Sequence, residues 1–233
     1  MYRRIIPDMF TTSNLVFGMC SILATFNGDY FWGSIFIMIA LCADGLDGRT
    51  ARFFGVAGEM GKEMDSLCDL VSFGVAPGFL VFSFCLKDYG ILGWVAVIFF
   101  AACGMWRLAR FNVNAATLHG YFMGLAIPAG GNILATSTLL FLLTGFNPRA
   151  LGIAYPIIVM IVAYLMVSHV HYPDFKGAGE KIYVGSKVFA VALFVFILYY
   201  GRDAIGAAVL FGLFATYALF GIFNYALALF SRR

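Results

Sequence analysis

Long apolar stretches alternate with short polar breaks along the whole sequence. A helix needs about 20 apolar residues to cross a bilayer. Eight stretches approach that length, and each is expected to be helical because lipid cannot satisfy free backbone N–H and C=O groups. They lie at residues 11–27, 30–48, 64–86, 90–109, 121–145, 150–168, 184–200 and 204–230. The pattern therefore predicts an all-α integral membrane protein with about eight transmembrane helices.

The composition supports this interpretation and limits the kinds of partner. Apolar residues make up 62% of the sequence and charged residues only 12%, whereas about a quarter of the residues in an average soluble domain are charged. A net charge of +3 is too small to indicate a nucleic-acid partner, so the expected surroundings are membrane lipids. Because the sequence has no linker-like or low-complexity stretch, residues 1–233 are predicted to form a single transmembrane domain.

The basic residues are distributed unevenly between the two sides of the predicted bundle. With the N-terminus inside, twelve of the fifteen Lys and Arg residues fall on its side, and only Lys87, Arg149 and Arg202 fall on the other. Basic residues accumulate on the cytoplasmic side of membrane proteins. This bias predicts a multi-pass protein of the cell membrane with both termini in the cytoplasm.

Four aspartates mark the most informative part of the sequence. At about 100° per residue, Asp44 and Asp47 lie on one stripe of a helix, together with Gly48. Asp65 and Asp69 are four residues apart, so they lie on successive turns of the next helix. Two carboxylates from each helix are therefore expected to face one another across a single cleft on the cytoplasmic side.

Carboxylates at the end of a membrane span are costly unless they are paired or bound to a cation. Hard oxygen ligands suit Mg²⁺ or Mn²⁺, and four carboxylates can hold two ions about 3.5–4 Å apart, which would clamp phosphoryl oxygens. Gly48 leaves room for a close ligand, and Arg52 offers a planar fork to a phosphate. The alternative is a set of unrelated acids or an ion pathway, but helical glycines and an arginine at the membrane surface favour a metal site.

The spacing of these residues resembles the signature of the CDP-alcohol phosphotransferases. The pattern Asp-x2-Asp-Gly-x2-Ala-Arg-x8-Gly-x3-Asp-x3-Asp is met at every fixed position. The resemblance implies a six-helix catalytic core, a homodimer, and attack by an alcohol on a CDP-linked phosphate. It also implies that Asp44 and Asp65 contact both metal ions and that Asp47 contacts the first. Asp69 would contact the second ion and, as general base, accept the proton of the attacking hydroxyl.

Further segments are similar to the serine-using branch of this family, the phosphatidylserine synthases. They are residues 65–77, 107–112 and 172–176. The implied reaction transfers the phosphatidyl group of CDP-diacylglycerol to the hydroxyl of L-serine and gives phosphatidylserine and CMP.

The N-terminal segment resembles the Pro-Asn-x-x-Thr motif of these synthases, with Asp8 where Asn is usual. The resemblance implies that Asp8, Thr11 and Asn14 contact CDP-diacylglycerol, together with Gly48 and Arg52.

A serine carboxylate needs a cationic partner, and two arginines end the fourth predicted span. Arg107 and Arg110 are three residues apart and therefore neighbours on a helix. Asn112 would complete a serine pocket. The alternative is that the arginines anchor the span at lipid headgroups and that Asn112 caps the helix.

Two other functions stay open at this point. The same chemistry with glycerol 3-phosphate or an inositol phosphate would need a more basic pocket than Arg107 and Arg110 provide. An ion-coupled transporter would carry acids at mid-span in two related halves, whereas these acids cluster in one helical hairpin near one surface.

Overall fold

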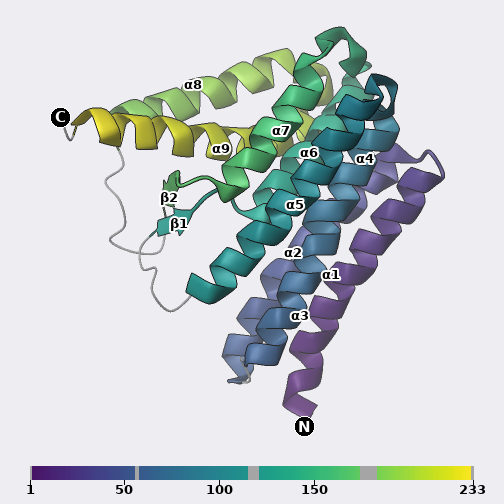
Figure 1. Ribbon diagram of the computed structural model, residues 1–233, viewed down its shortest axis with the longest axis vertical. Helices are drawn as coiled ribbons and strands as arrows, with labels where there is room; N and C mark the ends of the chain where they lie inside the picture. Colours follow the sequence, from purple (N-terminus) through teal and green to yellow (C-terminus); the bar gives the residue numbers. More distant parts are fainter. Residues whose placement is uncertain (1, 56–57, 115–120, 174–182, 232–233) are drawn as a thin grey trace.

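The computed structural model describes residues 2–55, 58–114, 121–173 and 183–231, and these are almost entirely helical (Figure 1). The α-helices are α1 (Tyr2–Phe26), α2 (Tyr30–Phe54), α3 (Glu59–Asp69), α4 (Ala76–Phe84), α5 (Ile91–Asn114), α6 (Ile127–Thr144), α7 (Ala154–Val167), α8 (Val184–Tyr200) and α9 (Ile205–Ser231). A π-helix, η1 (Leu70–Val75), joins α3 to α4 without a break. Short 3₁₀ turns lie at η2 (Leu86–Tyr89), η3 (Pro148–Leu151) and η4 (Arg202–Ala204).

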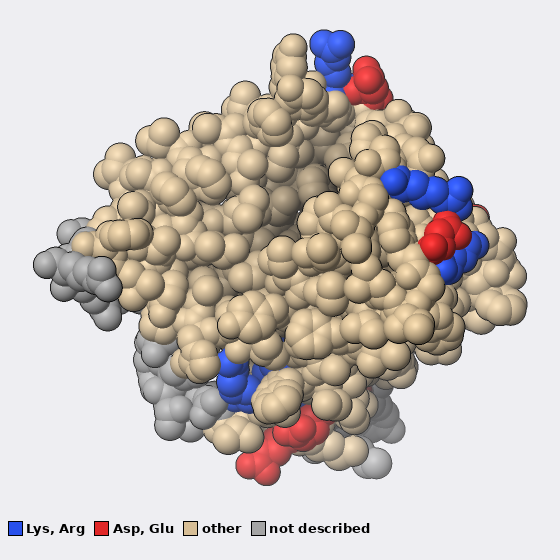
Figure 2. Space-filling model, turned by 45° about the horizontal axis from the view of Figure 1, so that its top comes forward, with Lys and Arg blue, Asp and Glu red and all other residues tan. Residues whose placement is uncertain are grey.

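Within the described residues, six helical segments are long and apolar enough to cross a membrane. They are Asp8–Phe26, Tyr30–Thr50, Glu59–Phe84, Ile91–Val113, Ile127–Thr144 and Arg202–Phe230. Two shorter apolar helices, Ala154–Val167 and Val184–Tyr200, coincide with the other two predicted spans. Figure 2 shows a broad uncharged face with charged side chains at its margins. The multi-pass, all-α prediction is confirmed, and a count of eight crossings stays a prediction.

The start of the fifth predicted span differs from the structure. Residues Tyr121–Met123 form a short strand, β1, which pairs antiparallel with β2 (His171–Pro173). Helix α6 begins only at Ile127, with a proline in its first turn, where the missing N–H costs nothing. Apolar residues before a helix and within it look alike in the sequence, so hydrophobicity alone placed this boundary six residues too early.

The strand β2 is tied to α9 by one buried aromatic side chain. Tyr172 is fully buried, and its hydroxyl donates a hydrogen bond of 3.1 Å to the carbonyl of Ala218. Burial raises the pKa of the Tyr172 phenol, so the group stays a neutral donor. A Cβ at position 221 would collide with the Tyr172 ring, so the chain needs glycine there.

Helix α6 forms the centre of the molecule. Almost every residue from Ile127 to Leu139 is buried, and the helix contacts α2, α4, η1, α7 and α9. Helices α1 and α2 pack side by side at one edge, joined by a turn in which Gly28 has a φ of +80°. Helices α8 and α9 form a pair that leans away from α1–α5 (Figure 1). This arrangement places the C-terminal part of α2 and the N-terminal part of α3 at the same end of the bundle.

Candidate metal centre and active site

Three of the four predicted carboxylates converge. One carboxylate oxygen from each of Asp44, Asp47 and Asp65 lies within 4.8 Å of the other two. Asp69 falls outside this group but lies beside it, near enough to Asp44 for the two carboxylates to interact electrostatically. The acids of α2 and α3 therefore face one another, as the helical spacing predicts.

Helix α1 supplies a hydrogen-bond donor to each of the two acid-bearing helices. The Thr11 hydroxyl donates to Oδ2 of Asp47 at 2.9 Å, and the Asn14 amide Nδ2 donates to Oδ1 of Asp69 at 3.0 Å. All four side chains are buried. Thr11 and Asn14 share one face of α1 because they are three residues apart. Asp8, which begins the same face, is exposed.

The two residues predicted to contact the pyrophosphate, Gly48 and Arg52, both belong to α2. Gly48 is half-buried and follows Asp47 in the same turn. The side chain of Arg52 lies outside the described part of the chain, as do residues 174–176 of the segment that resembles the serine-using branch.

Arg107 is buried beside the acids. Its side chain is only 8% exposed, and its Nε has no hydrogen-bond partner within the described residues. It lies within electrostatic range of Asp69 and Asp44, and its guanidinium carbon is 5.4 Å from the centre of the Phe111 ring. A buried cation with an unused donor therefore faces the carboxylates.

Arg110 has a different environment from Arg107. Its guanidinium donates to four backbone carbonyls: Val167 at 2.8 Å, and Met123, Met166 and Ser168 at 3.2 Å each. A Cβ at Gly124 would lie 2.9 Å from Nη2 of Arg110. These contacts join α5 to the end of α7 and to β1. Arg110 is thus placed as a structural bridge, and its contact with the serine carboxylate stays a prediction.

Asn112, near the C-terminal end of α5, contacts α3. Its Nδ2 donates to Oγ of Ser66 at 2.9 Å and to Oε2 of Glu63 at 3.3 Å. Lys62 Nζ donates to the backbone carbonyl of Asn112 at 3.0 Å. The Oδ1 atom of Asn112 is buried without a hydrogen-bond partner among the described residues. Asn112 therefore connects α5 to the helix that carries Asp65 and Asp69.

The carboxylates fit a divalent cation. Among the described residues, the only ion pair joins Arg149 to Asp88 at 2.5 Å, so no described Lys or Arg forms a salt bridge with these acids. The Oδ1 atom of Asp65 is buried and accepts no hydrogen bond from a described residue. Closely spaced hard oxygen donors with an unused buried oxygen are the ligand set that Mg²⁺ or Mn²⁺ prefers.

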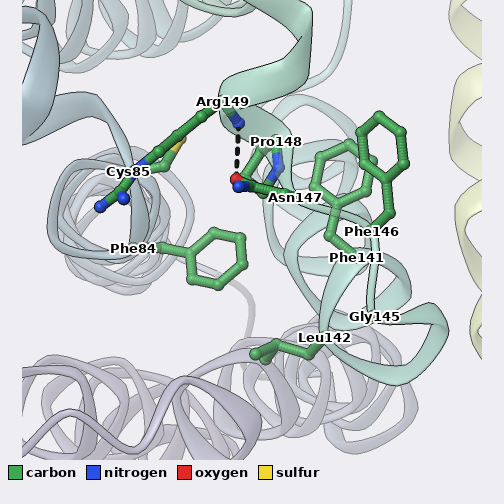
Figure 3. A pocket seen from close by; sticks show the side chains of 9 residues that line it. All are labelled: Phe84, Cys85, Phe141, Leu142, Gly145, Phe146, Asn147, Pro148 and Arg149. Atoms are coloured by element: carbon green, nitrogen blue, oxygen red, sulfur yellow. Dashed lines mark hydrogen bonds between the residues drawn. The ribbon is translucent and has the colours of Figure 1, made fainter.

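At the other end of the bundle, the described residues form no such set of ligands. A cavity of about 280 Å³ lies there between the ends of α4 and α6, lined mainly by aromatic and aliphatic side chains (Figure 3). Burial raises the pKa of the Cys85 thiol in its wall to about 12, so this thiol stays protonated. Among the described residues, the carboxylate group that could hold a metal ion thus lies at the end formed by α1, α2 and α3.

An apolar helical bundle that gathers carboxylates at one end has the features of a membrane protein with a site for a divalent cation. The family model for CDP-alcohol phosphatidyltransferases matches residues 4–171. This chain belongs to that family, whose members use divalent metal ions.

Similar proteins come from bacteria and archaea. The chain is 32% identical to the CDP-diacylglycerol–serine O-phosphatidyltransferase of Helicobacter pylori, over 91% of this chain and 89% of that protein. It is 34% identical to the Bacillus subtilis enzyme of the same name, over 77% and 97% of the two chains. It is 36% identical to archaetidylserine synthase of Methanothermobacter thermautotrophicus, over 76% and 72%.

Proposed function

We propose that the protein is a CDP-diacylglycerol–serine O-phosphatidyltransferase of phospholipid biosynthesis. It transfers the phosphatidyl group of CDP-diacylglycerol to the hydroxyl of L-serine and gives phosphatidylserine and CMP. The observation that carries this proposal is the convergence of Asp44, Asp47 and Asp65 beside Asp69, in a chain similar over most of its length to enzymes named for this reaction.

Asp44, Asp47, Asp65 and Asp69 would hold two divalent cations, Mg²⁺ or Mn²⁺. When bound, these ions would neutralise charge on the phosphoryl oxygens of the substrate. Thr11 holds one oxygen of Asp47 through its hydrogen bond and so fixes the orientation of that carboxylate. Gly48 and Arg52 are proposed to contact the pyrophosphate, and Asp8 and Thr11 to contribute on the nucleotide side.

Asp69 is proposed to act as the general base. The serine hydroxyl oxygen forms a bond to the lipid-side phosphorus, its proton passes to the Asp69 carboxylate, and the bond from phosphorus to the CMP oxygen breaks. CMP leaves with the electrons of that bond. A positioned base contributes roughly 10²–10⁴ in rate, so alignment and charge stabilisation supply most of the rest.

Serine recognition is assigned to Arg107. Its buried, unpartnered Nε is a charged donor near Asp69, and an arginine fork is well suited to a carboxylate. Arg110 donates hydrogen bonds to backbone carbonyls, so we propose Arg107 as the arginine that binds the serine carboxylate. Asn112 borders the pocket from the α3 side and offers an unpartnered Oδ1.

The arrangement in the cell is part of the same proposal. The uneven distribution of Lys and Arg supports a cell-membrane protein whose active site faces the cytoplasm, with both termini on that side. Residues 1–233 would form one domain of eight spans that assembles as a homodimer.

A phosphorylated acceptor is disfavoured by the charges around the site. Glycerol 3-phosphate or an inositol phosphate carries more negative charge than serine, yet Arg107 is the one buried cation with an unused donor beside the acids in the described part of the chain. Transport is disfavoured because the acids lie at one end of one hairpin.

The test is to incubate the purified protein with CDP-diacylglycerol, a divalent cation and one of several alcohols. L-serine is expected to give the fastest release of CMP. The assignment to serine fails if glycerol 3-phosphate or inositol phosphate outcompetes it, and the reaction class fails if no alcohol releases CMP.

A further inference from the structure

Asn14 is built into the structure as a partner of Asp69. It is fully buried, and its Nδ2 lies 3.0 Å from Oδ1 of Asp69. A carboxylate only accepts hydrogen bonds when ionised, so the amide must present its N–H group to Asp69. The hydrogen bond thereby fixes the position of one Asp69 oxygen.

The backbone of Asn14 is held as well as its side chain. The Ser72 hydroxyl donates a hydrogen bond of 2.9 Å to the Asn14 carbonyl. One turn further along α1, a Cβ at Gly18 would lie 2.9 Å from Cα of Ser72 and closer still to its hydroxyl oxygen. Helix α1 can approach η1 this closely only because residue 18 has no side chain.

The segment that follows Asp69 is held on a second side. Asp69 immediately precedes the π-helix Leu70–Val75, and π-helical turns occur frequently at functional sites. A Cβ at Gly131 of α6 would lie 2.6 Å from the carbonyl oxygen of Phe73. The π-helix therefore fits between α1 and α6 at two positions where only glycine is tolerated, and this fixes the direction in which Asp69 points.

We infer that Asn14 is a positioning residue for Asp69, and that Ser72 and Gly18 hold Asn14 in place. The amide keeps Oδ1 of Asp69 occupied, so that Oδ2 accepts the proton of the attacking hydroxyl. This inference rests on the proposed function. It replaces the expectation from the sequence that Asn14 contacts CDP-diacylglycerol.

The test separates turnover from substrate binding in Asn14→Ala. The turnover number with saturating serine is expected to fall by roughly 10²-fold, in the range that a well-placed base contributes. Binding of CDP-diacylglycerol, measured by calorimetry in detergent micelles with Mn²⁺ and without serine, should change less than threefold (about 0.7 kcal/mol). Thermal unfolding should stay within a few degrees of wild type.

Two further variants complete the test. Ser72→Ala removes the hydrogen bond to the Asn14 backbone but leaves the Asn14 side chain in place. We therefore expect roughly a tenfold loss of turnover with unchanged binding of CDP-diacylglycerol. Ser13→Ala is the matched control on the same helix. Within the described part of the chain, the Ser13 hydroxyl donates to the Met9 carbonyl of its own helix at 2.7 Å and to no group of the site, so this change should leave turnover unaltered.

The inference is overturned if Asn14→Ala weakens CDP-diacylglycerol binding tenfold while turnover at saturation is retained, since Asn14 would then be a nucleotide contact. If Asn14→Ala does not fold, Ser72→Ala decides, and wild-type turnover in that variant overturns the inference. Failure of the proposed function gives a different result. The wild-type protein would then release no CMP with serine, and Asn14→Ala would be measured with whichever alcohol the panel identifies.

Discussion

The Thr11 hydroxyl donates a hydrogen bond of 2.9 Å to the Asp47 carboxylate, across the interface between α1 and α2. The two residues are 36 positions apart, and both are buried. The contact gives the N-terminal helix a direct influence on the carboxylate group, because a ligand held by a hydrogen bond keeps its orientation when a cation is absent.

Thr11→Val should weaken metal binding without abolishing folding. Valine keeps the shape of threonine but cannot donate, and loss of such a supporting partner typically costs about 10–100-fold in metal affinity or activity. Titration with Mn²⁺ followed by electron paramagnetic resonance measures the affinity directly. Thr12→Val is the control, because among the described residues the Thr12 hydroxyl donates to the Asp8 carbonyl of its own helix and not to an acid of the site. Equal Mn²⁺ affinities for the two variants would show that the Thr11 contact has no role in the site.

Asp44→Asn and Asp65→Asn should each abolish turnover. Both side chains belong to the convergent carboxylate group, and an amide is a neutral and weaker ligand than a carboxylate. Removal of divalent cations with a chelator should likewise stop CMP release in the wild type, and added Mg²⁺ or Mn²⁺ should restore it. A correctly inserted variant that kept more than about a tenth of wild-type turnover would contradict the role of these acids as shared ligands.

Asp69→Asn should separate binding from chemistry. Asp69 lies outside the group of three carboxylates, so CDP-diacylglycerol should bind with near-normal affinity, while turnover falls by roughly 10²–10⁴. Calorimetry and single-turnover CMP release measure the two quantities. Loss of CDP-diacylglycerol binding in this variant would instead assign Asp69 mainly to the metal site.

The two arginines of α5 should respond differently to substitution. Arg107→Ala should raise KM for serine more than a hundredfold, because an unmet buried carboxylate costs about 3 kcal/mol. Arg110→Ala should instead lower the free energy of unfolding by several kcal/mol, since hydrogen bonds to charged groups contribute about 1.5–3 kcal/mol each.

Serine kinetics and thermal unfolding of the detergent-solubilised protein check both variants, and each serves as the control for the other. A selective rise in KM for serine in Arg110→Ala, with stability unchanged, would return Arg110 to the serine pocket.

Cysteine labelling tests the orientation of the spans. In a background without the five native cysteines, single cysteines at positions 28, 88 and 202 should react with a membrane-impermeant maleimide added outside intact cells. A cysteine at position 55 should react only after permeabilisation, because it lies at the end that carries the aspartates. Labelling of positions 28 and 55 from the same side would overturn the predicted topology.

The sequence predicts the carboxylate group well because its geometry is mostly local. Asp44 and Asp47 are three positions apart and Asp65 and Asp69 are four positions apart, so the helical repeat alone places each pair on one face. Apolar length likewise predicts the helices, because it reflects the bilayer and not the packing partner.

Contacts between distant segments could not be predicted in the same way. The carbonyls that surround Arg110 come from Met123 and from residues 166–168. Every residue has a backbone carbonyl, so the sequence does not indicate which ones accept these hydrogen bonds. The pairing of β1 with β2 joins segments about 50 residues apart, and each strand is too short to show a periodic pattern. Ser72 stands three residues after Asp69, but its bond to Asn14 depends on how closely α1 packs.

The position of the carboxylates at one end of the bundle has a consequence for the membrane itself. A headgroup assembled there would emerge in the leaflet that supplied the CDP-lipid. The opposite end of the bundle is closed by turns that an ion pair between Arg149 and Asp88 joins. Each turnover would therefore change the charge of a single leaflet, and a serine lipid in the other leaflet would require a separate step of translocation. The orientation of this one helical hairpin in the membrane would thus set the initial difference in lipid composition between the two leaflets.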